Sequence, residues 1–445
     1  MKKISLISLF NIIVFILFCD SLWAVPVSAK DPAWLVDKEI SRVCNGWNEG
    51  FIKCASPRGG YNDITENQKI LNSWGYKARN MEEIKGLLPE VFYTLFSHPE
   101  LWGTFRINET SWEKVKPRGT IWNKFITQSE KNKGLVYLDD KNWLREYKYG
   151  IPFPDLDEND PEIAIKLIWN FFKRYKDNDR IVRMDVATRD KRGNQKHRLI
   201  INSRLQMNGR VKEDAVTIDG LYQPNPNNYD FIYATPFISP YNLRGVIPLY
   251  YRYNDPDVDD DMWLYLPQFR RVRRMSTSQH QDRLPGGVDW TYDNTEGFEG
   301  HVARFNYTYM GRRELLIPVI GHSHCYFNPD GMMNGVDQYY QRRNTYVLKI
   351  SYKEPIIMTD IILYLDPLLY SACYSIDMDL KGRTWLIQLV TQGRNKDWFY
   401  TMYDDFVIDI LERHGTRALF AFSGSVGYKV NDLSMTNLKK IYLSR

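Results

Sequence analysis

The sequence lacks the glycine-rich patterns that bind nucleotides. Neither a P-loop nor a G-x-G-x-x-G pattern follows any strand-like segment. Ser423 and Ser425 lie in the stretch FSGSVG, but neither has the glycine two residues before it that a nucleophile elbow requires. The acidic runs 155–160 and 255–261 carry Asp where a calcium-binding EF-hand loop needs glycine. We therefore predict a protein that is not an enzyme and that needs no cofactor.

Long apolar runs are also missing, except at the start of the chain. Two lysines precede an apolar stretch from Ile4 to Phe18, and small residues follow up to Ala29. This order predicts a secretory signal peptide in residues 1–29, because the stretch is shorter than the roughly 20 residues that cross a bilayer. We expect an exported protein that does not span a membrane after cleavage. The net charge of +5 over 445 residues does not indicate a nucleic-acid partner.

Cysteine is scarce, and four cysteines follow the predicted signal peptide: Cys44, Cys54, Cys325 and Cys373. An even number of cysteines in an oxidising compartment leaves three pairings open. We favour a disulfide between Cys44 and Cys54, because their short loop lies in a polar, glycine-rich stretch with little else to hold it. Cys325 and Cys373 have apolar and aromatic neighbours, which is typical of buried thiols.

Histidine is scarce too, with seven in the chain. His322 and His324 lie two residues apart, so on a strand both side chains would face the same way and could bind one metal ion. A third ligand is not evident nearby. The alternative is a pair of histidines that is satisfied or exposed at the end of a strand.

Aromatic residues, in contrast, are abundant. They form 14% of the chain, with 30 tyrosines and 13 tryptophans, which favours β-structure. From residue 180 onward, strand-like segments alternate with turn residues such as Arg192-Gly193-Asn194. The predicted strands cover 180–188, 197–207, 231–239, 246–253, 262–266, 302–310, 315–320, 345–352, 356–365, 370–378 and 385–391, with a last pair near Ala418 and Tyr428. This series predicts a mainly β protein with helices, an α+β fold built on a large curved antiparallel sheet or half-barrel.

We expect the sheet to occupy residues 151–445 and residues 30–150 to form helices and loops that pack on it. One helix is predicted near 160–176, where Asp160 is a suitable cap and Pro161 a suitable first residue. Apolar residues at helical spacing make one stripe along this helix. The stripe fits either packing on the core or a lid over a ligand.

The stretch from Asp255 to Pro318 is the most distinctive part of the sequence. Within it, Trp263 and Tyr265 would point to one side of a short strand, and Leu264 and Leu266 to the other. Both faces of the strand are therefore bulky. Such a strand is usually covered by the core on one face and by a helix, a partner or a ligand on the other.

Four arginines follow this strand after Pro267, and two of them, Arg271 and Arg273, share one face. They fit a solvent-exposed rim strand whose charges prevent it from pairing with the edge strands of other chains. The competing interpretation is a rim that binds an anion.

Four longer stretches together resemble a known family. They are GIPFPDLDENDPEIAIKLIWNF (150–171), SPYNLRGVIPLYYRYNDPDVDDDMWLYLPQFRRVRRMSTSQHQDRL (239–284), TEGFEGHVARFNYTYMGRRELLIPV (295–319) and YLDPLLYSACYSIDMDLKGRTW (364–385). From about Met81 to Leu438 the chain resembles unknown-function family 1329, exported bacterial proteins related to outer-membrane lipoprotein-sorting carriers. The resemblance implies a curved half-barrel with helices over its concave apolar face. It also implies a periplasmic protein, free or associated with the outer membrane, that binds lipids or other hydrophobic molecules alongside membrane export machinery and has no catalytic residues.

The residues and the resemblance lead to one main hypothesis, a periplasmic, non-enzymatic carrier of a lipid, a lipoprotein acyl chain or another hydrophobic compound that assists envelope transport. The predicted cavity wall is Trp263, Tyr265, Phe305, Tyr307 and Tyr309, and the predicted rim contacts to a headgroup or partner are Arg271 and Arg273. The alternative is a structural or interaction subunit of an envelope export complex. A third hypothesis is a metal-dependent hydrolase that uses His322 and His324.

Overall fold

The computed structural model describes residues 70–72, 84–96, 105–109, 117, 119–320, 335–394, 400–424 and 427–443. The predicted signal peptide, the cysteines Cys44, Cys54 and Cys325, and the histidines His322 and His324 lie outside these described residues.

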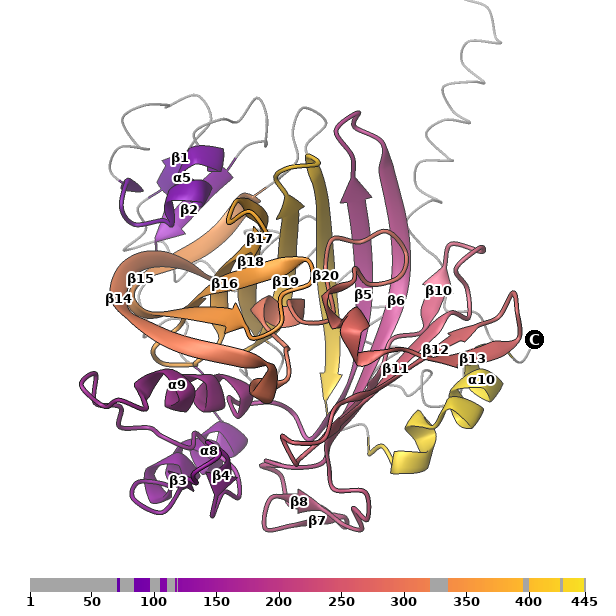
Figure 1. Cartoon of the computed structure of the whole chain (residues 1–445), viewed down its shortest axis with the longest axis horizontal. Helices are drawn as coiled ribbons and strands as arrows, with labels where there is room; N and C mark the ends of the chain where they lie inside the picture. Colours follow the sequence, from indigo (N-terminus) through magenta and orange to yellow (C-terminus); the bar gives the residue numbers. More distant parts are fainter. Residues whose placement is uncertain are drawn as a thin grey trace, which may run out of the picture.

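One large sheet dominates the described part of the chain (Figure 1). Its strands are β1 (Ile70–Asn72), β2 (Phe105–Glu109), β5 (Asp179–Arg189), β6 (Gln195–Gln206), β9 (Tyr229–Ala234), β10 (Phe237–Ser239), β11 (Ile247–Tyr253), β12 (Asp261–Leu266), β13 (Arg271–Arg274), β14 (Phe305–Ile320), β15 (Gly335–Tyr352), β16 (Met358–Leu365), β17 (Ala372–Asp379), β18 (Thr384–Arg394), β19 (Tyr400–Asp409) and β20 (His414–Gly424). Two small two-stranded sheets pair β3 (Tyr137–Leu138) with β4 (Leu144–Arg145) and β7 (Thr217–Ile218) with β8 (Leu221–Tyr222).

The helices are few and short. They are α5 (Glu90–Phe96), α8 (Thr120–Lys131), α9 (Ile163–Phe172) and α10 (Met435–Leu443), with 3-10 turns η3 (Thr277–Gln281), η4 (Thr295–Gly297), η5 (Val302–Arg304) and η6 (Val430–Leu433).

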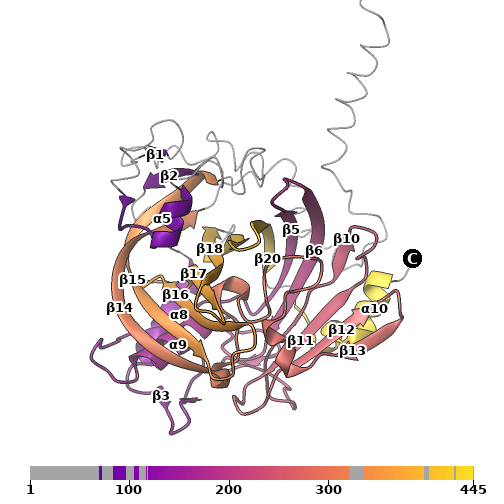
Figure 2. The same cartoon turned by 45° about the horizontal axis from the view of Figure 1, so that its top comes forward.

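The strands of the large sheet follow the order β1-β2-β15-β16-β17-β18-β19-β20-β5-β6-β9-β11-β12-β13, and β14 and β10 pair with β15 and β6. Neighbouring strands are antiparallel, except that β2 runs parallel to β15. The sheet curves strongly and stays open, with β14 to β18 curling on one side and β5 to β13 forming a wing on the other (Figure 2). The predicted fold class, a large curved antiparallel sheet with helices, is confirmed.

The prediction of two strands in the region of β14 was wrong. We predicted separate strands at 302–310 and 315–320, whereas residues 302–304 form the turn η5 and a single strand follows from Phe305 to Ile320. Gly311, at φ +93°, lies in a register shift between Tyr309 and Arg312. This bulge lets the strand bend and continue its pairing with β15, so the polar residues after it do not end the strand.

The C-terminal strand pair was also misplaced. The observed pair is β19 with β20, and Tyr428 follows β20 in an irregular segment. The backbone N–H of Tyr428 donates a hydrogen bond to the Asp179 carboxylate (2.8 Å), and its hydroxyl bonds to Ser203 (2.9 Å). Tyr428 therefore ties the C-terminal segment to the outer face of β5 and β6.

The two faces of the sheet are separated by the alternation of side chains along each strand. On β5, Val182 and Val186 belong to the core of the concave face, while Ile181 packs on the other side beneath the C-terminal segment. Helix α9 packs into the concave core, where Leu167 and Phe171 are fully buried. The predicted helix near 160–176 thus packs on the core.

The concave core also contains residues 277–304, which we call the interior segment. This segment carries η3, η4 and η5 between β13 and β14 and crosses in front of β20 and β5 in Figure 1. Asp289, Trp290 and Asn294 on it are buried and hydrogen-bond to Thr416, Asp405 and Asp377 on three different strands. The concave side is therefore filled partly by an irregular, polar stretch of the chain itself.

A glycine holds the interior segment close to the sheet. Gly297 has φ +90°, and a Cβ on it would lie 2.4 Å from the Ala372 Cβ. We expect Gly297→Ala to lower the free energy of unfolding by about 2 kcal/mol, because it adds both backbone strain and overpacking. Gly382, at φ +72° with open space around it, is the matched control. Urea unfolding should show a clearly smaller loss in the free energy of unfolding for Gly382→Ala than for Gly297→Ala. Equal losses in the two variants would mean that packing against Ala372 is unimportant.

Candidate functional site

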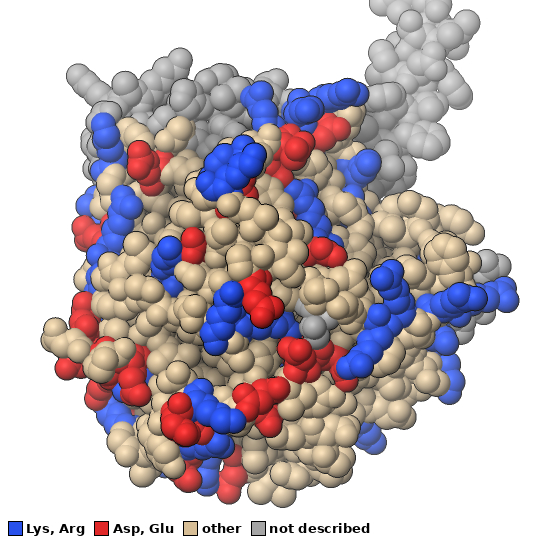
Figure 3. All heavy atoms as spheres, viewed as in Figure 1, with Lys and Arg blue, Asp and Glu red and all other residues tan. Residues whose placement is uncertain are grey.

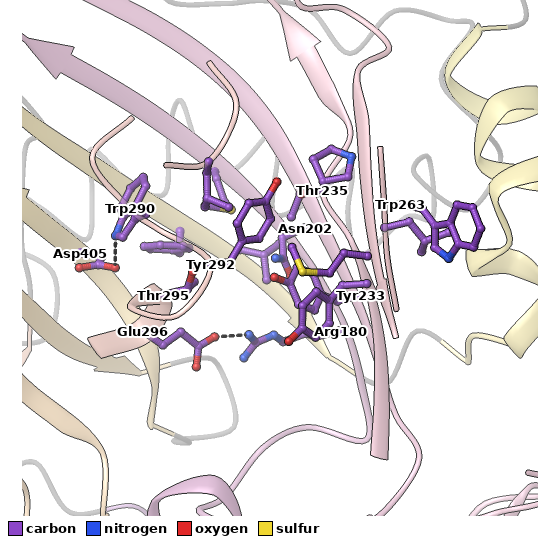
Figure 4. A pocket seen from close by; sticks show the side chains of 18 of the residues that line it. Arg180, Asn202, Tyr233, Thr235, Trp263, Trp290, Tyr292, Thr295, Glu296 and Asp405 are labelled. Carbon is purple, nitrogen blue, oxygen red and sulfur yellow. Dashed lines mark hydrogen bonds and ion pairs between the residues drawn. The ribbon is translucent and has the colours of Figure 1, made fainter. Parts of the chain in front are cut away.

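A pocket lies between the wing of the sheet and the interior segment (Figure 4). Its empty volume is about 740 Å³, including the space open to solvent. The wall is mainly aromatic and thioether in character, formed by Met184, Tyr233, Tyr250, Met262, Trp290 and Tyr292 among others.

The sheet side of the wall is a row of cross-strand neighbours. Tyr250 on β11 lies opposite Tyr233 on β9 and opposite Met262 on β12. The rings of Tyr233 and Tyr250 stack with their centroids 5.0 Å apart. Because directly opposite residues of antiparallel strands point to the same face, three separate strands present one continuous apolar surface to the pocket.

The other side of the wall belongs to the interior segment. The indole N–H of Trp290 donates a hydrogen bond to the Asp405 carboxylate on β19 (2.8 Å). Asp405 in turn accepts hydrogen bonds from the Gln388 side chain (2.7 and 2.6 Å). Tyr292 contacts Met275 through its hydroxyl and the sulfur (3.3 Å). These contacts hold the two aromatic rings in fixed orientations facing the sheet.

One end of the pocket is charged. Glu296 forms ion pairs with Arg180 and Arg174, each at 2.6 Å, and all three side chains are almost completely buried. Burial by itself raises the pKa of a carboxyl group, but the nearby Arg180 and Arg174 outweigh it and hold the pKa of Glu296 below its ordinary value. The polar end of the pocket is therefore the ionised Glu296 carboxylate with the Arg180 guanidinium group, and Arg174 pairs with the same carboxylate outside the pocket lining.

The charged network continues away from the pocket. Glu299 lies 3.6 Å from both Arg204 and Arg252, and one of its carboxylate oxygens is buried without a hydrogen-bond partner. Lys176 lies beside it, and burial together with Arg204 holds the pKa of this lysine well below its ordinary value. Lys176, Arg252 and Glu299 are among the residues that line a second pocket, of about 440 Å³ including the space open to solvent.

The chemistry that this arrangement offers is binding. The residues lining the first pocket provide apolar surface, amide and hydroxyl groups, and an ion pair at one end. Among the residues that the structure describes, no three His, Cys, Asp or Glu side chains are grouped so that they could hold a metal ion.

The predicted wall residues Trp263 and Tyr265 lie on the outer face of β12. Tyr265 is buried against Leu433 and Leu438, and the Lys439 ammonium lies 5.1 Å from the centre of its ring. Trp263 borders the pocket, but its indole points away from it toward α10 (Figure 4). The two residues do share a face, as alternation predicts. That face is the one covered by the C-terminal helix, because alternation alone does not say which side of a strand is concave.

The other predicted wall residues lie together on β14, apart from the pocket. Phe305 is buried, with ring centroids 5.0 Å from Phe298 and 4.6 Å from Tyr352. Tyr307 donates a hydrogen bond to the Val302 carbonyl (2.9 Å), and Tyr309 donates one to Glu158 (2.8 Å). The structure thus brings the three aromatic residues into the concave core. Their role in ligand binding stays a prediction.

Arg271 and Arg273 are exposed on the edge strand β13, as predicted for a rim. The neighbouring Arg274 pairs with Asp261 at the surface. Asp260 differs, because it is buried and pairs with Arg252 inside the fold. Whether Arg271 and Arg273 bind a headgroup stays a prediction.

The sequence analysis did not identify Trp290, Tyr292 and Glu296. The stretch VDWTYDNTEGFEG, residues 288–300, shows neither the period of a strand nor that of a helix. A signal was nevertheless present, since two aromatic residues stand among closely spaced Asp, Asn and Glu residues and two glycines. Such a mixture is typical of an irregular segment whose polar groups are satisfied inside a protein.

Comparisons with solved structures give three similar chains. A DUF1329 family protein from Desulfovibrio piger ATCC 29098 has 16% identity and a TM-score of 0.45, covering 61% of this chain and 96% of its own. A putative outer membrane lipoprotein-sorting protein domain from Vibrio parahaemolyticus has 16% identity and a TM-score of 0.47, covering 63% and 100%. A LolA superfamily protein from Nitrosomonas europaea has 10% identity and a TM-score of 0.38, covering 59% and 93%.

A comparison with curated proteins finds no match to this chain. In the part of the chain that the structure describes, every helix is too short or too polar to cross a membrane. The family model described as Protein of unknown function (DUF1329) matches residues 77–421, which is well over half of the chain. The protein therefore belongs to the DUF1329 family.

Proposed function

We propose that this protein is a periplasmic, non-enzymatic carrier that binds a lipid, a lipoprotein acyl chain or another hydrophobic molecule. The observation that carries the proposal is the pocket between β5 to β12 and the interior segment, with its apolar walls on both sides. The predicted signal peptide, which indicates export, supports the periplasmic location.

The energetics of such a site require few specific contacts. Each methylene group transferred from water into an apolar pocket contributes about 0.8 kcal/mol, so an alkyl chain can be held largely by burial. The rings of Tyr233, Tyr250 and Trp290 offer flat surfaces against which such a chain can lie. Because Trp290 is oriented by Asp405, the pocket is largely formed before a ligand arrives.

Filling the pocket should abolish most of the binding. Thr235 lines the pocket, and we expect Thr235→Trp to weaken binding of the neutral hydrophobic dye N-phenyl-1-naphthylamine at least roughly tenfold, because an indole would occupy the volume that an apolar ligand needs. A fluorescence titration measures the affinity. Native mass spectrometry of protein purified from its host shows whether a lipid stays bound.

The matched control is Thr308→Trp, which makes the same chemical change at an exposed position of β14. This variant should bind the dye as the unchanged protein does. If the unchanged protein shows no saturable binding and no co-purified lipid, the carrier proposal is wrong. The hypothesis of a structural subunit in an envelope complex would then be favoured.

A further inference from the structure

Two loops lie side by side at the far end of the wing. One connects β10 to β11 and the other connects β12 to β13. The pairing of Ile247 with Tyr265 brings the loops to the same end of the sheet, and the Gln268 side chain donates a hydrogen bond to the Asn242 carbonyl (2.8 Å). We call residues 240–245 and 267–273 together the wing tip.

The wing tip exposes large apolar side chains. Tyr241 is 85% exposed and Phe269 is 69% exposed, and they stand next to the two residues of the hydrogen bond that joins the loops. Val272 on the adjoining strand is 41% exposed. Single exposed apolar residues need no explanation, but two exposed aromatic side chains on loops joined by a hydrogen bond do need one.

The wing tip is also strongly basic. Arg244, Arg270, Arg271 and Arg273 belong to it, and the segments 240–245 and 267–273 contain neither Asp nor Glu. Within the described part of the chain, none of these four arginines forms an ion pair. Other exposed cations do have partners, such as Lys141 with Asp257 (2.6 Å). Figure 3 shows the basic side chains gathered at the right-hand edge, where Figure 1 places β13 and α10.

We infer that the wing tip docks the protein on the surface of an anionic lipid bilayer. Guanidinium groups bind phosphate through several donors, and basic residues near an anionic leaflet are attracted to it. Exposed aromatic rings beside them insert at the level of the headgroups. An acidic protein partner is the less suitable occupant, because stable protein interfaces bury about 800 Å² on each side and the apolar residues here stand at the ends of two loops.

The position of the wing tip relative to the pocket determines how the docked protein is oriented on the bilayer. Met262 and Met275 line the pocket at one end of the β12–β13 hairpin, and Phe269 lies in the turn at its other end. Docking therefore brings the edge strands that border the pocket to the bilayer. The inference goes beyond the proposed function and does not depend on it, since the wing tip and the pocket use different residues.

Vesicle sedimentation tests the inference. We expect the purified protein to bind vesicles of phosphatidylcholine and phosphatidylglycerol (3:1) and to bind pure phosphatidylcholine vesicles at least about tenfold more weakly. Arg271→Gln with Arg273→Gln should weaken binding to the anionic vesicles about 25-fold, because each basic residue near such a surface contributes about fivefold. Tyr241→Ala with Phe269→Ala should weaken it about tenfold, and this loss should persist at high salt.

Control variants distinguish the effect of the wing tip from the effect of the protein's net charge. Arg192→Gln with Lys381→Gln removes the same charge from exposed turns elsewhere and should leave vesicle binding within about twofold. Tyr137→Ala removes another exposed aromatic side chain and should have no effect. Absence of binding to the anionic vesicles overturns the inference, as does an equal loss in the control pair. Capture of an acidic protein without vesicle binding would overturn it in the same way.

Discussion

Replacing Glu296 by Gln should lower the free energy of unfolding by about 3–5 kcal/mol, the largest loss that we expect from a single isosteric change. The substitution removes the negative charge that two buried guanidinium groups share. Arg180 and Arg174 would keep their charges and lose the carboxylate that lies 2.6 Å from each of them. Urea denaturation of the variant and of the unchanged protein, analysed with the same m-value, measures the loss in the free energy of unfolding.

The change from Glu296 to Gln alters the charge of the side chain and hardly alters its size. Glutamine has nearly the size of glutamate, so the left-handed backbone at position 296, with φ +56°, and the local packing are retained. Glu162→Gln is the control, since that carboxylate pairs with Lys166 at the surface (3.0 Å). Surface pairs contribute about 0–1 kcal/mol. A loss at Glu296 no larger than the loss at Glu162 would contradict the role assigned to the buried network.

Asp377→Asn should stabilise the protein at pH 8 by up to about 4 kcal/mol and leave its stability at pH 4 nearly unchanged. Burial raises the pKa of Asp377 to about 7, while hydrogen bonds from Asn294 (2.8 Å) and Ser375 lower it only in part. In the unfolded chain this carboxyl has its ordinary pKa near 3.8. Between these two values the folded state binds the proton that the unfolded state has released.

The sign of the pH dependence follows from this difference. The contribution of Asp377 to stability is fully present below about pH 4 and is lost as the pH rises toward 7, because the folded protein must then ionise a buried carboxyl group. Asparagine keeps an acceptor for Asn294 and carries no charge, so its advantage appears only at high pH. Unfolding measured at several pH values from 4 to 8 should show the two proteins diverging as the pH rises.

Asp379 on the same strand provides a control of opposite sign. Hydrogen bonds from Arg383 hold the pKa of Asp379 below its ordinary value. Its contribution is present above the unfolded pKa and is lost as the pH falls through the folded pKa. Asp379→Asn should therefore destabilise the protein at neutral pH. If Asp377→Asn has the same effect at pH 4 and pH 8, the carboxyl does not titrate in this range and the prediction is wrong.

Local patterns predicted the local structure well. The turn at Arg192-Gly193-Asn194 is present, with the Asp190 carboxylate accepting hydrogen bonds from two backbone N–H groups of the turn (2.9 and 3.0 Å). The start of α9 was predicted two residues too early, because the helix begins at Ile163 and not at Pro161. The Asp160 carboxylate accepts a hydrogen bond from the backbone N–H of Glu162 (2.8 Å) in the turn before the helix. Both carboxylates bond to backbone groups close in sequence, so propensity and spacing suffice to predict such turns.

The candidate site was not predictable in the same way. Its walls come from the middle strands of the wing and from residues 284–296, and its charged end joins Arg174 and Arg180 to Glu296 more than a hundred residues away. The pairing of distant polar residues leaves no local pattern in the sequence. Periodicity could describe the strands, but the irregular segment that completes the pocket has no period.

The sequence by itself determined most of the strands, their alternating faces and the aromatic-rich composition of a curved sheet. It also placed Trp263 and Tyr265 on one face of their strand and four arginines beyond it. The tertiary structure decided which face is concave, because the interior segment and the C-terminal helix cover opposite sides of the same strands. The direction in which a side chain points alternates within a strand, whereas what covers that side depends on chain segments far away in the sequence.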